Sequence, residues 1–361
     1  MRKIAIVVVG FSAETVSGSL LRPMNIYRSL KSIRNLTIKY IPVGKFPYFL
    51  FYLPLISCPE VRVIIISGVS PWVSAIVTFG GRILKKKVVM DFHGFGWLEA
   101  SILGSTKWYM KVLTLISEKI SYKFSTYVTV ASKWLFNMLT YYFGNRRNIY
   151  IIENSVPYIF ERVVNVLVRA YSDASALRAY VCRKVLRRLG CGDKLLFVAP
   201  LPAVFKSNVL AFEELLKVER ALGGDVLIVV TGIKGAVGRL RNVVVAGYLS
   251  YVDYVALLLS SDGVILPYPS RAICGGARNK VLEAGFCGKP VLSTKTGMMF
   301  VKALPSIHYV ALERESVIEK LKREDLKEIS VKLNELVKEH YSFVRFKHSF
   351  LMLLMRVIIE T

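Results

Sequence analysis

The segment Cys274–Thr294 combines the residue types that hold a phosphorylated sugar. It reads CGGARNKVLEAGFCGKPVLST, so two glycines lead into a predicted helix over Arg278–Cys287 that carries one acid, Glu283. Free backbone N–H groups and the helix dipole at such an N-terminus both favour an anion. A carboxylate one turn further along accepts hydrogen bonds from sugar hydroxyls. The segment therefore predicts a site for a phosphorylated sugar.

Two cations accompany this segment. Lys206 follows a predicted strand, in a loop before a helix that Ser207 is expected to cap, and Arg278 stands at the start of the helix that carries Glu283. A cation in either place can meet a diphosphate leaving group and stabilise the negative charge that develops on it. The alternative for each is an ordinary solvated side chain.

His93 is the candidate of the first half. It follows a predicted strand and stands between Asp91 and Gly94. Ligands of parallel sheets bind at the carboxyl ends of the strands, which favours a functional histidine over a structural one.

Three further side chains of the first half are weaker candidates. Arg22 either meets an acceptor phosphate or lies on the surface of the first helix. Glu99 and Glu118 are the other two, and Glu118 is expected to be structural.

The elements that position these residues alternate between strands and helices. In the first half the predicted strands span Ile4–Val9, Leu36–Pro42, Val61–Ser67, Lys87–Phe92, Tyr127–Val130 and Tyr150–Ile152, and the predicted helices span Ser19–Ser32, Pro71–Leu84, Thr106–Phe124 and Lys133–Phe143. Continuous apolar strands between helices indicate a parallel sheet covered on both faces.

The alternation restarts after a basic segment, Tyr158–Asp193, that is predicted to be helical. The later strands are expected at Lys194–Ala199, Val226–Val230, Asn242–Ala246, Gly263–Leu266 and Pro290–Ser293, and the later helices at Asn208–Leu222, Tyr251–Ser260, Arg278–Cys287, Glu313–Lys322, Glu324–Tyr341 and Phe343–Glu360.

This pattern predicts an α/β protein with two doubly wound, Rossmann-like domains that face each other across a cleft. The predicted domains are residues 1–157 and residues 158–341. Residues 342–361 are expected to form a helix that crosses back to the N-terminal domain. A length of 361 residues fits two hydrophobic cores better than one.

Charge and composition indicate the partners. The net charge is +25, and residues 1–150 hold 20 Lys and Arg against 5 Asp and Glu, so they carry +15. Such a surplus attracts nucleic acid or an acidic membrane surface. The sequence contains no glutamine, which hints at a hot-living source because thermolabile amides are scarce in such proteins.

The sequence predicts no zinc site, no disulfide framework, no metal-dependent reaction and no transmembrane helix. Five scattered cysteines without C-x-x-C spacing imply neither a zinc site nor a disulfide framework, so the reducing cytoplasm is the default. No D-x-D motif occurs, which favours a reaction without metal. The longest uncharged stretch, Val63–Gly81, is interrupted by glycines and proline and predicts no transmembrane helix.

The chain resembles the family 4 retaining glycosyltransferases, which have the GT-B fold. Four blocks of the second half carry the resemblance: LLFVAPLPAVFKSNVLAF at Leu195–Phe212, VVVAGYLS at Val243–Ser250, SSDGVILPY at Ser260–Tyr268, and the segment Cys274–Thr294. In the first half, VMDFHG at Val89–Gly94 resembles the family's D-x-H-G, and IIENSV at Ile151–Val156 resembles I-x-N-G-V.

The resemblance implies a role for each candidate residue. It implies a metal-independent hexosyltransferase in which His93 and Lys206 are catalytic, the diphosphate assists the attack, and Glu283 holds the ribose of the donor. The other donor-binding residues that it implies are Gly18, Gly275, Gly276, Ala277, Arg278 and Asn279. It also implies that residues 1–157 form the acceptor-side domain and that residues 158–341 bind the nucleotide sugar.

Two positions depart from the family pattern. The family's first acid, which contacts the donor sugar, corresponds here to Gly275, and the arginine of the first block corresponds to Pro200. Either the backbone N–H groups of Gly275, Gly276 and Ala277 contact the sugar instead, or catalysis is weakened or lost.

Three functions therefore stay open. The favoured one is glycosyl transfer from a nucleotide sugar to a lipid-linked or glycan acceptor, in the cytoplasm at the inner face of the cell membrane. It is favoured because the basic, amphipathic segment Lys107–Phe124 and the aromatic segment Lys45–Ile56 suit a membrane surface. The alternatives are a non-catalytic relative that binds a nucleotide or glycan, and an enzyme that glycosylates nucleic acid. Nucleic acid is the less expected partner because aromatic residues interleave the cations.

Overall fold

The chain folds into two compact units. The computed structural model describes residues 4–11, 18–33, 36–43, 53–104, 106–171, 173–186, 194–203, 205–219, 225–233, 242–312 and 325–360. Unit 1 comprises Met1–Ser155, Cys274–Ala277 and Phe343–Thr361, and unit 2 comprises Val156–Ile273 and Arg278–Ser342. Four residues of the glycine-rich segment, Cys274–Ala277, thus belong to unit 1, although they lie far along the chain in the half expected to form the second domain.

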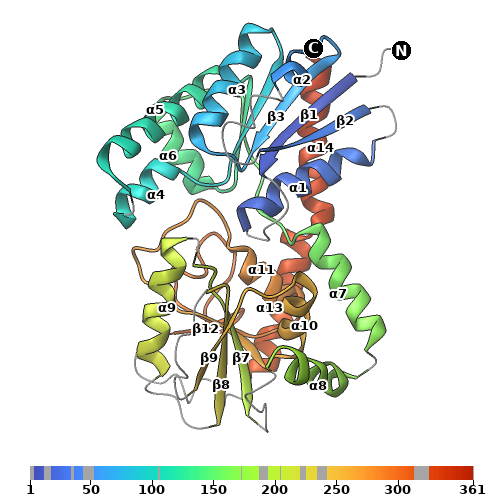
Figure 1. Cartoon of the computed structure of the whole chain (residues 1–361), viewed down its shortest axis with the longest axis vertical. Helices are drawn as coiled ribbons and strands as arrows, with labels where there is room; N and C mark the ends of the chain where they lie inside the picture. Colours follow the sequence, from blue (N-terminus) through green and yellow to red (C-terminus); the bar gives the residue numbers. More distant parts are fainter. Residues whose placement is uncertain are drawn as a thin grey trace. The chain divides into compact units, whose positions relative to one another are not determined.

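Unit 1 is built on a six-stranded parallel sheet in the order β2-β1-β3-β4-β5-β6 (Figure 1). Its strands are β1 (Ile4–Phe11), β2 (Leu36–Val43), β3 (Val61–Ser67), β4 (Lys87–Phe92), β5 (Tyr127–Val130) and β6 (Ile149–Ile151). All six apolar runs predicted as strands are confirmed to within two residues at each end. The central strands β1, β3, β4 and β5 are largely buried, as strands between two helical layers must be, whereas the edge strands β2 and β6 are only partly buried.

Helices cover this sheet. They are α1 (Gly18–Lys31), α2 (Leu53–Ser57), α3 (Pro71–Ile83), α4 (Gly96–Leu103), α5 (Trp108–Phe124), α6 (Lys133–Phe143) and α14 (Phe343–Ile359). The short helix α4 was not predicted from the sequence. Most of the aromatic segment 45–56 lies outside the described residues, and its last residues enter α2.

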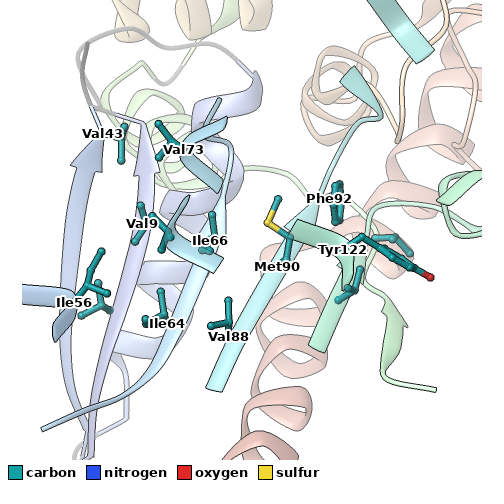
Figure 2. Packing of buried hydrophobic residues seen from close by; sticks show 14 of the residues in the cluster. Val9, Val43, Ile56, Ile64, Ile66, Val73, Val88, Met90, Phe92 and Tyr122 are labelled. Atoms are coloured by element: carbon teal, nitrogen blue, oxygen red, sulfur yellow. The ribbon is translucent and has the colours of Figure 1, made fainter. Parts of the chain in front are cut away.

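The core of unit 1 lies between the sheet and its helices. Figure 2 shows β-branched side chains of neighbouring strands, among them Val9, Ile64, Ile66 and Val88, beside Val73 of α3. Each is at most 1% exposed. Burying such a side chain contributes about 1.5–3 kcal/mol, so this cluster fixes the strand ends that carry the site.

The C-terminal helix α14 belongs to unit 1 and packs on α1. Near its end, the guanidinium of Arg356 lies 5.7 Å from the centre of the Tyr150 ring. The hydroxyl of Tyr127 donates a hydrogen bond to Glu360.

Unit 2 contains a second six-stranded parallel sheet, in the order β12-β11-β10-β7-β8-β9. Its strands are β7 (Leu195–Pro200), β8 (Val226–Thr231), β9 (Val243–Gly247), β10 (Gly263–Leu266), β11 (Val291–Ser293) and β12 (Val310–Ala311). The chain adds strands outward from β7 on one side and then returns to add β10 on the other. The first five strands were predicted, whereas β12 is too short to show a pattern in the sequence.

The helices of unit 2 are α7 (Tyr158–Ala170), α8 (Ala174–Lys184), α9 (Lys206–Glu219), α10 (Tyr251–Ser260), α11 (Asn279–Phe286) and α13 (Leu326–Tyr341). The helix predicted at 313–322 lies outside the described residues. The basic segment after Tyr158 forms two helices, α7 and α8.

The expectation that the cysteines form no disulfide is wrong at Cys182, which is disulfide-bonded. Its partner lies outside the described residues. The other described cysteines, Cys58, Cys274 and Cys287, carry free thiols.

Within the described residues, no helix combines the length and the apolar character needed to cross a bilayer.

Candidate functional site

A buried carboxylate organises the carboxyl edge of the sheet in unit 1. Asp91 of β4 pairs with Ser67 of β3 and Thr129 of β5 in the strand register. The Ser67 and Thr129 hydroxyls each donate to it at 2.6 Å. Arg22 donates from Nε at 2.9 Å and from Nη2 at 2.8 Å. Burial alone would raise the pKa of Asp91, but the charge and hydrogen bonds of Arg22 outweigh it and hold the pKa below its usual value.

Arg22 is therefore neither a surface residue nor available for an acceptor phosphate, and both sequence-based interpretations are wrong. Its side chain is 4% exposed. Besides Asp91, its guanidinium donates to the Asn154 side-chain oxygen at 2.9 Å and to the Ile152 carbonyl at 2.8 Å. It also lies 5.4 Å from the centre of the Phe346 ring. Three strands, α1 and α14 are thus joined through one ion pair.

His93 leaves the end of β4 two residues after Asp91. Its Nδ1 atom is buried and finds no hydrogen-bond partner among the described residues. Burial lowers the pKa of His93, and the Arg22 charge adds to this, while Asp91 opposes it. The imidazole is therefore neutral near pH 7, so one ring nitrogen can accept a proton or a hydrogen bond.

The segment Cys274–Ala277 packs beside His93. The Ser132 hydroxyl, which caps α6, donates to the Gly275 carbonyl at 2.7 Å. The Asn154 amide donates to the Ala277 carbonyl at 2.8 Å. The Oδ1 atom of the same Asn154 side chain accepts the hydrogen bond from Arg22. The Arg22–Asp91 ion pair therefore also orients the amide group that holds the segment.

The hydrogen bonds to this segment use its carbonyl groups and leave its N–H groups open. Gly275, Gly276 and Ala277 are buried, yet none of their backbone N–H groups donates to any described residue. Buried backbone donors are almost always paired, so consecutive open ones indicate a ligand or ordered water.

Gly275 has no room for a side chain. A Cβ atom built on it would lie 2.5 Å from the Gly94 Cα and 2.7 Å from the His93 carbonyl oxygen. A Cβ on Gly276 would lie 2.7 Å from the Ala131 side chain. A side chain at position 275, an acid included, is therefore sterically excluded, since this loop approaches the backbone of Gly94 and His93 too closely.

Two carboxylates hold the loop that follows His93. Glu118 of α5 accepts hydrogen bonds from the backbone N–H groups of Gly96 at 2.7 Å and Trp97 at 3.1 Å, at the start of α4. Glu99 accepts one from the Phe95 N–H at 3.3 Å. Burial raises the pKa of Glu118 to about 8. Glu118 is structural, as expected, and the structure it maintains is the loop beside His93.

In unit 2, the candidate residues lie around the point where the strand order reverses, between β7 and β10. Such switch points, at the carboxyl ends of parallel strands, are where ligands of doubly wound sheets bind. Lys206 begins α9 after β7, so the helix starts one residue before the expected cap, Ser207. Its side chain is exposed, and no described residue pairs with its ammonium. Pro200 ends β7.

A polar cluster that the sequence did not predict spans this switch point. Tyr268 follows β10, and its hydroxyl donates to the Asn208 side-chain oxygen of α9 at 2.6 Å. The Lys280 ammonium donates to the same oxygen at 2.8 Å and to the Tyr268 hydroxyl at 2.7 Å. The three residues lie far apart in the sequence, so no local pattern indicated this cluster.

Arg278 precedes the first residue of α11, Asn279. Its guanidinium stacks on the Tyr268 ring, with its carbon 3.6 Å from the ring centre. Nη2 donates to the Ala272 carbonyl, whereas Nε is buried without a partner among the described residues. Arg278 and Lys280 thus bring two positive charges to one aromatic ring.

Glu283 is 5% exposed, and neither Lys280 nor Lys289 forms an ion pair with it. Its Oε2 accepts a hydrogen bond from the Tyr254 hydroxyl of α10 at 2.7 Å. Lys289 instead donates to the Ser261 carbonyl. Burial raises the pKa of Glu283 to about 7, although the Tyr254 hydrogen bond and the Lys280 charge lower it in part.

The last two points concern Gly18 and possible metal ligands. Gly18 is the first residue of α1 rather than part of the preceding loop. No cluster of three or more histidine, cysteine, aspartate or glutamate side chains suited to a metal ion occurs among the described residues.

Comparison with known proteins gives structural likeness only. No protein-family model matches the sequence, and a sequence search of curated proteins found no match. HepE from Anabaena, solved in complex with UDP-glucose, aligns over 98% of this chain and 100% of its own with a TM-score of 0.68 and 11% identity. Sucrose-phosphate synthase from Thermosynechococcus elongatus aligns over 99% and 100%, with a TM-score of 0.72 and 11% identity.

The fold is GT-B. WaaG, a glycosyltransferase involved in lipopolysaccharide biosynthesis, is a third example, with a TM-score of 0.63 and 11% identity over 97% of this chain and 99% of that one. The similarity covers both units, which confirms the predicted fold class. At such identities it establishes the GT-B fold and leaves the chemistry to the residues of the site.

Proposed function

We propose that this protein transfers a sugar from a nucleotide-diphosphate donor to a lipid-linked or glycan acceptor. The observation that carries the proposal is the segment Gly275–Ala277, whose buried N–H groups have no partner among the described residues and which packs against His93. These groups suit the oxygens of a sugar or a phosphate. HepE, one of the similar structures, was solved with UDP-glucose bound.

Each candidate residue has a role in this proposal. From unit 1, the neutral His93 and the N–H groups of Gly275–Ala277 contact the donor sugar. From unit 2, Glu283 accepts hydrogen bonds from the ribose hydroxyls, and Lys206, Arg278 and Lys280 provide the positive charge for the diphosphate. Gly18 and Asn279 line the donor through their backbone and side chain, respectively.

We further propose that the acceptor attacks on the face that the diphosphate leaves, so that the anomeric configuration is retained. The departing diphosphate oxygen takes the acceptor proton, and the cations of unit 2 stabilise its charge. No metal is assigned, because this role falls to the lysine and arginine side chains. The proposed location is the inner face of the cell membrane.

A thermal-unfolding screen with UDP-, GDP-, ADP- and TDP-sugars tests the donor site. A ligand at about 100 times its dissociation constant stabilises the folded state by about 2.7 kcal/mol. At least one nucleotide sugar is expected to raise the melting temperature, and Glu283→Gln is expected to reduce the shift. No shift with any of the four classes would contradict the proposal.

A second candidate is a GT-B protein that binds a nucleotide or glycan without catalysis. The specific observation in its favour is the steric exclusion of an acid at position 275. A nucleotide sugar that stabilises the protein but is neither transferred nor hydrolysed would support this candidate.

A further inference from the structure

Helices α3 and α5 form an exposed apolar face on unit 1. The outward positions of α3 are Trp72, Ile76, Phe79 and Ile83, which recur every three or four residues and lie on one side of the helix. A surface helix normally presents polar residues on this side. Here the solvent side of α3 carries large apolar side chains throughout.

Helix α5 continues this face. The two helices pack side by side (Figure 1). The Phe79 and Phe124 rings meet edge to face with centres 5.3 Å apart, and the Ser74 and Ser121 hydroxyls are 2.9 Å apart beneath them. The large apolar side chains that α5 exposes are Trp108, Tyr109, Met110, Val112, Leu113, Ile116 and Phe124.

The exposure of these side chains is large. Trp108 is 76% exposed, Ile83 is 65% exposed and Leu113 is 54% exposed. Contiguous apolar patches of this kind on a folded unit mark a protein or membrane interaction site.

The charges around the face have one sign. Arg82 and Lys85 lie at the end of α3, and Lys107, Lys119 and Lys123 lie on or just before α5, all of them exposed. Residues 71–87 contain no acid, and the single acid of residues 106–124, Glu118, is buried against the start of α4. The face therefore offers apolar and aromatic side chains with only positive charges at its surface.

We propose that the α3–α5 face, defined by these exposed apolar residues and cations, binds the surface of an anionic lipid bilayer. Tryptophan and tyrosine favour the boundary between headgroups and acyl chains, and lysine side chains reach the headgroup phosphates. This inference identifies the surface of the protein that contacts the membrane. It rests on the proposed function only in that a lipid-linked acceptor would lie in that membrane.

The charges decide between a bilayer and other partners. Each lysine near an anionic leaflet contributes favourable energy, and no acid of the face opposes it. A nucleic acid would match the cations but would leave the apolar stripe of α3 exposed to water. A second copy of the chain would place like charges opposite one another.

Flotation with phosphatidylcholine vesicles, with and without phosphatidylglycerol, tests the proposal on the full-length protein. Binding is expected with the anionic vesicles at low salt. It should weaken by about fivefold for each of Lys119→Ala and Lys123→Ala. Ile83→Glu and Leu113→Glu are expected to weaken it by at least about tenfold.

Met355→Glu is the matched control. This residue of α14 is also in unit 1, and its exposed fraction of 57% is similar to the 54% of Leu113. It lies outside the α3–α5 face. It should bind vesicles as the wild type does. Equal loss in Met355→Glu and Leu113→Glu would overturn the proposal, as would the absence of wild-type binding at low salt.

Two further measurements separate the other outcomes. Filter binding with duplex DNA and the sedimentation coefficient as a function of concentration are recorded for the wild type and Leu113→Glu. If the wild type does not bind vesicles but Leu113→Glu reduces DNA binding, the partner is nucleic acid and the bilayer proposal is wrong. If Leu113→Glu instead reduces the concentration dependence of sedimentation, the partner is a second copy of the chain. Nucleotide-sugar thermal shifts on the same variants should stay unchanged, so a failed donor screen and a failed membrane test are distinguishable.

Discussion

Gly275 lies against Gly94 so closely that a Cβ atom on Gly275 would be 2.5 Å from the Gly94 Cα. Real Cβ atoms essentially never approach backbone atoms so closely, and backbone has little freedom to give way. The contact joins a segment far along the chain to the turn that carries His93. It excludes a side chain at position 275, and it makes both glycines part of one structural unit.

Gly275→Ala is expected to reduce both stability and donor binding. The methyl group must displace the segment or the His93 turn, and overpacking of this kind costs about 1–3 kcal/mol. Thermal unfolding with and without the nucleotide sugar found in the screen measures both effects. Gly275→Glu should be at least as damaging, so restoring the acid should not create or increase activity.

Gly80→Ala is the control for this prediction. Gly80 lies inside α3, and a Cβ there would meet nothing within 4 Å. Alanine is a better helix former than glycine, so this variant should gain about 0.5–1 kcal/mol. Equal tolerance of alanine at Gly275 and Gly80 would contradict the packing argument.

Glu283 should make donor binding depend on pH. Ribose hydroxyls donate to the ionised carboxylate, and the pKa of Glu283 is raised to about 7. Donor affinity should therefore rise about tenfold between pH 6 and pH 8, with release of a proton. Calorimetry in buffers of different ionisation enthalpy measures that proton, and Glu283→Gln should bind weakly at both pH values. A donor affinity that is the same at pH 6 and pH 8 would argue against contact between Glu283 and the ribose.

The same group should also affect stability. The unfolded chain ionises Glu283 near pH 4.5, whereas the folded chain keeps it protonated to about pH 7. The folded state binds the extra proton between these values, so the free energy of unfolding falls as pH rises through this window. Denaturant unfolding should show a fall of up to about 3 kcal/mol relative to Glu283→Gln. Parallel profiles of the two proteins would contradict it.

Lys280→Ala should weaken donor binding about tenfold, because it removes an ammonium from the switch point of unit 2 and with it a charge-assisted hydrogen bond to phosphate. Lys295→Ala, which removes an exposed lysine of the same unit, should have little effect. Isothermal titration with the donor measures both variants. A loss confined to stability, with unchanged affinity, would show that Lys280 serves only the Tyr268–Asn208 cluster.

Glu118→Gln should destabilise the protein by about 1–3 kcal/mol, because an amide nitrogen cannot accept one of the two N–H groups of Gly96 and Trp97. Because this loop follows His93, sugar transfer should slow at saturating donor. Glu335→Gln replaces an exposed acid of α13 and should leave stability and rate unchanged. Chemical denaturation and initial rates provide the two measurements.

Much of the fold was predictable because its signals are local. Buried parallel strands are continuous apolar runs, so all strands except β12 could be found, and β12 has only two residues. Helix α4 was missed because its first turn depends on Glu118, a residue of another helix. The two interpretations of Arg22 failed because both treated it alone, whereas its partner Asp91 is 69 residues away.

The sequence by itself determined the alternation of strands and helices, the glycine turn before α11 and the positive charge of the first half, since each follows from neighbouring residues or from composition. Only the tertiary structure decided that Cys274–Ala277 packs in unit 1, that Glu283 pairs with Tyr254 and that α3 and α5 share one exposed face. These relationships join residues distant in the chain. Their energies depend on burial and close contact, which no local pattern records.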